Sequence, residues 1–361
     1  MNDLKYWVWL SSLPGIGSRK FCDLINFFQT AENVFNSTSE ELKRCRIIKE
    51  EVVKTIANNR NLEKIDKYIK KVKDIGIKIY LSNQEEYPVN LKTIYDPPPV
   101  LYCLGELKQE DKEAIAIVGS RKASDYGLKT AEKLAEQLVQ NGITVVSGMA
   151  MGIDAAAHRG AIRGGGRTIA VFACGVTNPY PKSNINLYRE ILKNGAVVSE
   201  YPLGMQPHPG NFPARNRIIS GLALGSLIVE ANIKSGSLIT ADFALEQGRD
   251  VFAVPGNINS PSSLGTNNLI KNGAKLVDCV EDILSELPSR CLNKTSNRLI
   301  IQLGDTEALI AATLLDIGKT IDQIVNDTGL SINEVLSNAA IMELRGIIKS
   351  INGVYFCDLK H

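Results

Sequence analysis

The sequence has 361 residues, and its 41 basic and 39 acidic side chains give a formal net charge of +2. At about 150 residues per domain the length predicts two or three domains. The apolar content of 44% is that of a globular protein, which excludes a disordered or collagen-like chain. No stretch reaches the ~18 apolar residues of a membrane span, and the first residues lack a secretory signal. We therefore expect no membrane association.

The seven cysteines are scattered without C-x-x-C spacing, and the chain has only three histidines. This pattern fits neither a disulfide framework nor a zinc site. Free cysteine behaves as a small apolar residue, so we expect reduced, mostly buried thiols in a cytoplasmic protein. We expect no metal ion and no cofactor.

Residues 1–81 are predicted to be helical, because apolar residues recur there at helical spacing. The run Leu-Pro-Gly-Ile-Gly at 13–17 joins the first two predicted helices. Such a turn can present backbone N–H groups to a DNA phosphate, or it can be a plain tight turn in which glycine supplies positive φ. The sequence leaves both interpretations open. The proline run at 97–99 then marks the passage into a second domain, placed at 82–288.

The second domain alternates short β-branched runs with helical stretches. Continuous apolar strands between helices are typical of a parallel sheet buried on both faces, so we predict an α/β fold with a Rossmann-like, doubly wound core. Ligands of such sheets bind at the carboxyl ends of the strands. The predicted strands are 115–118, 144–146, 168–172, 196–198, 227–229, 251–254 and 275–277.

Residues 289–300 are polar and are predicted to be a linker to a third domain at 301–361. Helices at 320–326 and 332–344 flank a Thr-Gly-Leu-Ser turn, and a hairpin turns at Asn352-Gly353. This order predicts a winged helix. Its second helix carries Glu334 and Glu343, with Arg345 only at its end, whereas readers of the major groove depend on basic and amide side chains. We therefore favour protein interaction over DNA contact for this domain.

The segment after the first predicted strand suits a phosphate. Gly119 allows close approach of the backbone, Ser120 offers a hydroxyl, and Arg121 offers a fork of donors at a helix N-terminus. The spacing is not that of the dinucleotide fingerprint G-x-G-x-x-G, and the chain has no G-x-x-x-x-G-K-[ST] loop for ATP.

Further unusual residues follow other strands. Phe212 precedes Arg215, Asn216 and Arg217, which together resemble a stacking platform beside a phosphate clamp. The alternative is an arginine pair that joins loops and a phenylalanine in the core. Three helix N-termini with Gly, Ser or Arg at one sheet edge indicate a polyanion track.

Two residues near these strand ends could act as a base or a nucleophile, but we expect both to have structural roles. His158 has no nucleophile beside it in sequence and is expected to pack a helix. Cys174 is expected to be a packed thiol rather than a nucleophile.

Taken together, these motifs closely resemble the DNA-processing protein A family, DprA or Smf, over residues 95–285. The resemblance implies a binder of single-stranded DNA without turnover chemistry that forms a homodimer through its Rossmann-like domain. It further implies loading of RecA recombinase during natural transformation, an N-terminal helical domain of the SAM or helix-hairpin-helix type, and the winged helix. The matching strings are 117–121, 147–158, 212–217, 235–241, 246–249 and 254–256.

The resemblance also implies individual roles. Ser120 and Arg121 resemble phosphate contacts, Phe212 resembles the aromatic residue of a base pocket, and Arg215 and Arg217 resemble backbone clamps. The resemblance also implies backbone contacts at Gly148, Gly236 and Ser237 and a further contact at Lys182. The chain departs from the family at Met151, where arginine is usual and where methionine cannot bind phosphate.

An alternative comes from Rossmann-like hydrolases of nucleoside monophosphates in the lysine-decarboxylase-like (LOG) group. Their Pro-Gly-Gly-x-Gly-Thr-x-x-Glu loop corresponds here to 235–243, which lacks the second paired glycine and the final glutamate. Without a positioned carboxylate there is no evident general acid or base, so we predict a protein that is not an enzyme.

Overall fold

A nine-stranded sheet runs through the larger of two compact units, residues 1–286, and residues 287–361 form the smaller unit. This computed structural model describes residues 3–46, 48–287, 304–314, 318–345, 347–351 and 353–357. The predicted linker at 289–300 lies outside the described residues. None of the helices in the described ranges is long and apolar enough to span a bilayer.

The sheet has the strand order β1-β2-β6-β5-β4-β3-β7-β8-β9, in which the seven strands from β6 to β9 are parallel. Strands β3 to β7 are buried along their whole length, as expected when helices cover both faces. The prediction of a largely parallel α/β sheet is confirmed. These strands are β3 (Ala114–Val118), β4 (Thr144–Ser147), β5 (Thr168–Val171), β6 (Ala196–Ser199), β7 (Gly225–Ile228), β8 (Asp250–Ala253) and β9 (Lys275–Leu276).

Two antiparallel strands extend this sheet at one edge. β1 (Lys78–Leu81) pairs with β2 (Val100–Gly105), and β2 pairs with β6. The expectation that residues 1–81 are helical throughout is therefore wrong at its end. Helical spacing could not reveal this strand, because its pairing partner lies some twenty residues further along the chain, beyond the proline run.

The strand order reverses beside β3. From β3 the chain adds β4, β5 and β6 in one direction, and it then returns to place β7 on the other side of β3. Such a switch point leaves a crevice at the carboxyl ends of the two strands, where ligands of doubly wound folds bind. The connecting helices are α7 (Val89–Lys92), α8 (Asp125–Gln140), α9 (Ile153–Arg163), α10 (Ile185–Ile191), α11 (Asn211–Leu222), α12 (Leu238–Glu246), α13 (Leu264–Lys271) and α14 (Glu281–Leu284).

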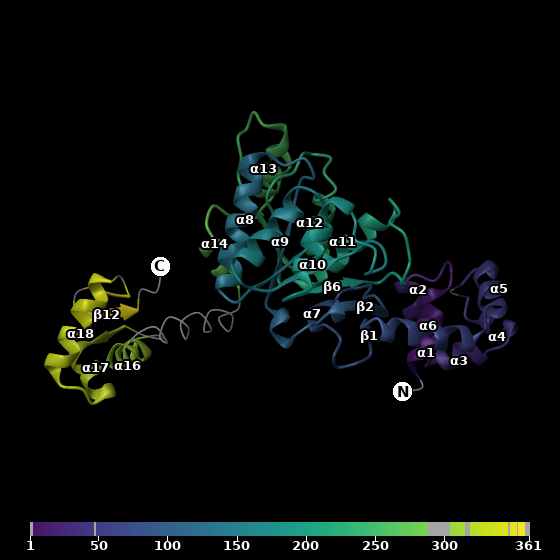
Figure 1. Cartoon of the computed structure of the whole chain (residues 1–361), viewed down its shortest axis with the longest axis horizontal. Helices are drawn as coiled ribbons and strands as arrows, with labels where there is room; N and C mark the ends of the chain where they lie inside the picture. The colour runs from purple at the N-terminus through teal and green to yellow at the C-terminus, as the bar shows by residue number, and fades with distance from the viewer. Residues whose placement is uncertain are drawn as a thin grey trace. The chain divides into compact units, whose positions relative to one another are not determined.

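Six N-terminal helices pack beside the β1–β2 end of the sheet (Figure 1). Their core is continuous with one face of the sheet, because Trp9 and Leu24 belong to the same apolar cluster as Tyr102 and Phe172. The Tyr68 hydroxyl accepts the Leu203 N–H at 2.8 Å and adds a polar link. The helices are α1 (Asp3–Ser12), α2 (Ser18–Phe28), α3 (Ala31–Asn36), α4 (Ser39–Arg44), α5 (Glu50–Asn58) and α6 (Leu62–Asp74).

The smaller unit combines helices with a three-stranded sheet of order β10-β12-β11. Gly329 ends α17 in the left-handed conformation with φ of 69°, which explains the turn before α18. The predicted turn residue Asn352 lies outside the described residues. The elements are α16 (Asp305–Thr313), β10 (Lys319–Thr320), α17 (Ile321–Thr328), α18 (Ile332–Leu344), β11 (Ile348–Ile351) and β12 (Val354–Cys357).

Candidate nucleic-acid interface

A cavity of about 1170 Å³ opens at the switch point, where the loops after β3 and β7 meet the start of α11. The fold brings together eight of the residues predicted from the sequence, which line this cavity: Gly119, Ser120, Arg121, Phe212, Arg215, Asn216, Gly236 and Ser237. Three others, Gly148, Lys182 and Arg217, are not part of the lining.

The loop after β3 is held by Glu230, a buried carboxylate just beyond β7. One Glu230 oxygen accepts the Ser124 N–H at 2.8 Å, and the other accepts the Ser262 hydroxyl. The Glu230 carbonyl accepts the Ser120 N–H at 2.7 Å. Because these bonds fix the loop from below, Arg121 is presented at the mouth of the cavity.

Phe212 and Tyr180 form an aromatic platform beside Arg121. The two rings lie 5.7 Å apart between centroids, and the Arg121 Cζ lies 5.2 Å from the Phe212 centroid. Arg121 is exposed, Tyr180 is 47% exposed, and Phe212 is half-buried. A guanidinium at this distance is attracted by the ring quadrupole. The arrangement can stack a planar ring and neutralise a nearby anion.

Arg215 lies beneath this platform and is only 3% exposed. Its Nη1 donates to the carbonyl of Gly148 at 2.8 Å and to that of Val171, and its Cζ lies 6.0 Å from the Phe212 centroid. A Cβ at Gly148 would overlap the guanidinium, so glycine is what allows this approach. The Arg215 Nε has no hydrogen-bond partner among the described residues. An unsatisfied buried donor is costly, and an anion in the cavity would relieve that cost.

Asp154 places one carboxylate in the cavity wall. Its Oδ2 accepts the Ala150 N–H at 3.3 Å. Burial raises the pKa of Asp154, and the nearby Arg215 charge lowers it. Burial in turn lowers the pKa of Arg215. Asp154 and Arg215 are both buried, so the exposed positive charge of the cavity comes from other residues.

Arg217 points away from the cavity. Residues two apart on an α-helix differ by about 200° in direction, so Arg215 and Arg217 of α11 occupy opposite sides. The buried Arg217 guanidinium forms an ion pair with Asp96 at 3.1 Å, and it donates to Glu200 at 2.6 Å and to the Ser18 hydroxyl at 3.0 Å. These contacts link α2, the proline-rich segment and the end of β6.

The start of α12 forms the far wall. Ser237 precedes the first residue of α12, and its side chain does not cap the helix; its hydroxyl lies 2.8 Å from that of Ser235. The Asn216 amide donates to the Gly236 carbonyl at 3.3 Å and joins this wall to α11. This wall therefore contributes the polar residues Ser235 and Ser237 to the cavity lining.

Two lysines of the cavity lining were missed from the sequence. Lys122 and Lys234 are exposed, and no carboxylate in the described ranges forms an ion pair with them or with Arg121. Both directly adjoin a predicted contact, since Lys122 follows Arg121 and Lys234 precedes the 235–237 segment. Their position next to predicted contacts is the sequence feature that could have identified both lysines. Met151 is 53% exposed and lies outside the lining.

His158 and Cys174 are interior residues. The His158 Nδ1 lies 2.7 Å from the Thr168 hydroxyl, and burial lowers the pKa of His158 to about 3. Burial raises the pKa of Cys174 to about 11. At neutral pH the imidazole is thus uncharged and the thiol protonated, which suits packing. Cys22, Cys45, Cys103, Cys174 and Cys279 form no disulfide bond, and Cys291 lies outside the described residues.

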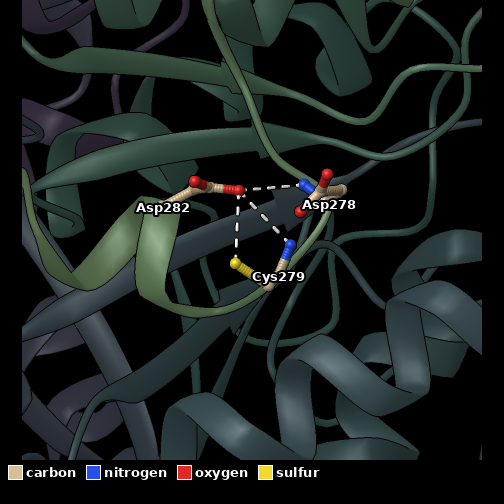
Figure 2. A group of neighbouring side chains, drawn as sticks. All are labelled: Asp278, Cys279 and Asp282. Carbon is tan, nitrogen blue, oxygen red and sulfur yellow. Dashed lines mark hydrogen bonds between the residues drawn. The ribbon is translucent and has the colours of Figure 1, made fainter. Parts of the chain in front are cut away.

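Asp278 and Cys279, which precede α14, gather around Asp282 in the first turn of this helix (Figure 2). The Asp282 Oδ2 accepts the Asp278 N–H at 3.0 Å, the Cys279 N–H at 3.3 Å and the Cys279 thiol at 3.5 Å. The first of these bonds is the main cause that lowers the pKa of Asp282. The group closes the turn into a short helix, and we assign it that role.

Comparison with known proteins places this architecture in a family. The model of the DNA recombination-mediator protein A family matches residues 78–288. The Smf protein of Synechocystis is 32% identical over 98% of both chains. The DNA processing protein DprA of Bacillus subtilis is 42% identical over 64% of this chain and 78% of its own length.

Solved structures agree with this assignment. The DprA structure from Streptococcus pneumoniae has a TM-score of 0.70 at 36% identity and covers 79% of this chain and 98% of its own. The structure that describes the single-stranded DNA binding mode of Helicobacter pylori DprA has a TM-score of 0.53 at 32% identity, over 58% of this chain and 94% of its own. The chain therefore belongs to the DNA recombination-mediator protein A family, whose members are named DprA or Smf.

Proposed function

We propose that this protein binds single-stranded DNA in the switch-point cavity and acts by binding, not by catalysis. The observation that carries the proposal is the half-buried Phe212 ring flanked by the guanidinium groups of Arg121 and Arg215. A stacking surface next to cations is what unpaired strands need, because every base has a π-face and every linkage carries a phosphate. The Helicobacter pylori DprA structure, which describes a single-stranded DNA binding mode, supports the same ligand.

In this proposal the predicted contacts divide into two groups. Phosphates meet Arg121, Ser120 and the α12 start at Gly236 and Ser237, while a base stacks on Phe212. Arg215 and Asn216 act from the floor and wall of the cavity. Gly148 serves by admitting Arg215, and Arg217 holds the surrounding elements together without reaching the DNA. Lys182 is exposed in the segment that follows Tyr180 and would meet a strand that leaves the cavity.

A binding assay tests this function. Fluorescence anisotropy with a labelled oligo-dT should give tighter binding than the matched duplex and an affinity that falls log-linearly with salt. Phe212→Ala should cost roughly 1–3 kcal/mol, the value of one base–aromatic stack. Phe27→Ala is the matched control, because Phe27 is 50% exposed on α2, outside the cavity lining. Equal affinity for duplex, or equal losses in the two variants, would refute the proposal.

We further propose that the protein loads RecA recombinase onto the bound strand during natural transformation, and that it does so as a homodimer formed through the Rossmann-like domain. The description of the family as recombination mediators supports this role. The mass of complexes with dT oligomers of increasing length measures site size and oligomeric state together. RecA should assemble on single-stranded DNA covered by single-strand-binding protein only when this protein is present. Nucleoside monophosphates should release no free base.

The domain organisation completes the proposal. We propose that the N-terminal helices form a SAM or helix-hairpin-helix type domain, and that the smaller unit is a winged helix. Because β1 belongs to the sheet and the family model begins at residue 78, the first boundary is proposed to precede residue 78. Limited proteolysis should cleave the chain in two if 289–300 is a linker.

A further inference from the structure

A four-residue sequence, Gly-Ser-Arg-Lys, occurs twice in the chain, at 17–20 and at 119–122. The second copy is the loop after β3, which presents Arg121 to the switch-point cavity. The first copy opens α2, and Gly17 precedes the helix there without a side chain to cap it. A Cβ added at Gly17 would meet no atom of the described residues within 4 Å, so the start of α2 is open.

Both copies place their arginine over an aromatic ring that comes from a distant segment. The Arg19 Cζ lies 5.4 Å from the centroid of the Tyr95 ring, and the Arg121 Cζ lies 5.2 Å from that of Phe212. Tyr95 precedes the proline run and is 78% exposed, so its ring is more open than that of the half-buried Phe212. We call Arg19 and Tyr95 the α2 platform.

The positive charge of the α2 platform is available to an anion. Arg19 is exposed, and no carboxylate in the described ranges forms an ion pair with it, including Asp23 one turn further along α2. Asp96, the residue after the aromatic ring, is already paired with Arg217 at 3.1 Å. Lys20 donates to a backbone carbonyl of the preceding turn at 2.8 Å and adds a second cation. An exposed cation beside an open ring can hold a phosphate and its base together.

Exposure separates the α2 platform from an ordinary packing contact. A further contact of this kind joins Lys5 to the Tyr6 ring at 5.1 Å. Tyr6 is only 7% exposed, and its hydroxyl donates to Glu32 at 3.0 Å. A ring that is buried in this way has no face for a ligand. The Tyr95 ring has one, and an unpaired base offers the matching π-face, whereas the bases of a duplex are stacked on each other.

The α2 platform and the cavity adjoin the same helix. Arg217 of α11 contacts Ser18 at 3.0 Å and Asp96 at 3.1 Å, and these two residues are the direct neighbours of the platform residues. Phe212 lies five residues earlier on α11, which is about 7.5 Å along the helix axis. One strand of several nucleotides can therefore contact both places.

We propose that the α2 platform is a second site for single-stranded DNA, used by a strand whose other part lies in the cavity. A base stacks on Tyr95, and a neighbouring phosphate meets Arg19 and the open start of α2. The proposal rests on the proposed function, because the cavity holds the rest of the strand.

Fluorescence anisotropy with the full chain and labelled oligo-dT of two lengths tests the proposal. Single-strand sites cover about 4–16 nucleotides, so the short oligomer has about 4 nucleotides and the long one about 16. Tyr95→Ala removes the ring and Tyr95→Phe keeps it, and both variants should fold because Tyr95 is exposed. Arg19→Gln removes the charge. Its control is Arg44→Gln, which removes an exposed arginine of α4.

The long oligomer should report the loss of the platform. We expect Tyr95→Ala to bind it about fivefold to hundredfold more weakly, which corresponds to one base–aromatic stack, and to bind the short oligomer like wild type. Tyr95→Phe should bind both lengths like wild type. With the long oligomer, Arg19→Gln should reduce the slope of log affinity against log salt by about 0.7, and Arg44→Gln should leave it unchanged.

Wild-type affinity of Tyr95→Ala for the long oligomer would overturn the proposal, and so would equal losses with both lengths. Duplex affinity that depends on Arg19 but not on Tyr95 would also overturn it, because the start of α2 would then bind paired DNA. Phe212→Ala separates this proposal from the proposed function, since it should weaken both lengths. If Phe212→Ala weakens both and Tyr95→Ala weakens neither, the α2 platform alone fails. If Phe212→Ala weakens neither, the cavity fails as the DNA site.

Discussion

Replacing Arg217 by methionine separates a structural role from a DNA-contacting one. The buried Arg217 guanidinium forms ion pairs with Asp96 and Glu200 and donates to the Ser18 hydroxyl. Methionine keeps much of the apolar length but removes the charge. Burial raises the pKa of Glu200 and the Arg217 charge lowers it, so the variant leaves a buried carboxylate without its cation. Breaking a buried pair in this way costs about 3–5 kcal/mol, and we expect about 3 kcal/mol because Asp96 is partly exposed.

Urea unfolding followed by tryptophan fluorescence measures this loss, since Trp7 and Trp9 are buried in the N-terminal helices. Without Arg217 the pKa of Glu200 rises further. The folded chain then holds a proton more readily than the unfolded chain, so the deficit should shrink as the pH falls from 8 to 5. Adding Glu200→Gln should recover part of the stability, as expected for coupled neighbours.

Affinity for oligo-dT decides between the two roles of Arg217. We expect Arg217→Met to keep wild-type affinity under conditions where it is folded, because the side chain lies outside the cavity lining. A variant with unchanged stability and a loss of about tenfold in DNA affinity would refute the reasoning, since it would mean that Arg217 reaches a phosphate.

Three further outcomes are expected. Arg121→Gln should weaken oligo-dT binding and reduce the slope of log affinity against log salt by about 0.7, the value of one phosphate contact on a single strand; an unchanged slope contradicts that contact. Gly148→Ala should lower the free energy of unfolding by about 1–3 kcal/mol, because the new Cβ displaces the Arg215 guanidinium. Wild-type stability in urea would contradict this, because it would mean that Arg215 can move aside without cost. The wild-type chain should lose about 2 kcal/mol of stability between pH 7.5 and pH 5, because the unfolded chain protonates His158 near pH 6.5 while the folded-state pKa is about 3. His158→Gln should show a smaller loss over that range, and an identical pH profile would exclude His158 as its source.

Much of the larger unit follows from local sequence. The apolar runs of β3 to β8 are fully or almost fully buried, and a segment buried on both faces must be apolar throughout. The position of the site at the carboxyl ends of the strands follows in turn, because parallel strands bring all their ends to one edge. Gly119, Arg121 and Phe212 could thus be named before any coordinates. The turn between α17 and α18 of the smaller unit was also predictable, because Gly329 favours the left-handed conformation that ends α17.

Contacts between distant segments were decided by the tertiary structure alone. Arg215 and Arg217 look equivalent in sequence, but α11 turns one toward the Gly148 carbonyl and the other toward Asp96 and Glu200. Which carboxylates neutralise an arginine depends on chain segments that only folding brings together. The same is true of β1, whose short run becomes a strand because β2 offers it hydrogen bonds. Local sequence determines what each segment can form and which chemistry it carries, whereas the packed fold determines which charges are cancelled inside the protein and which remain for a ligand.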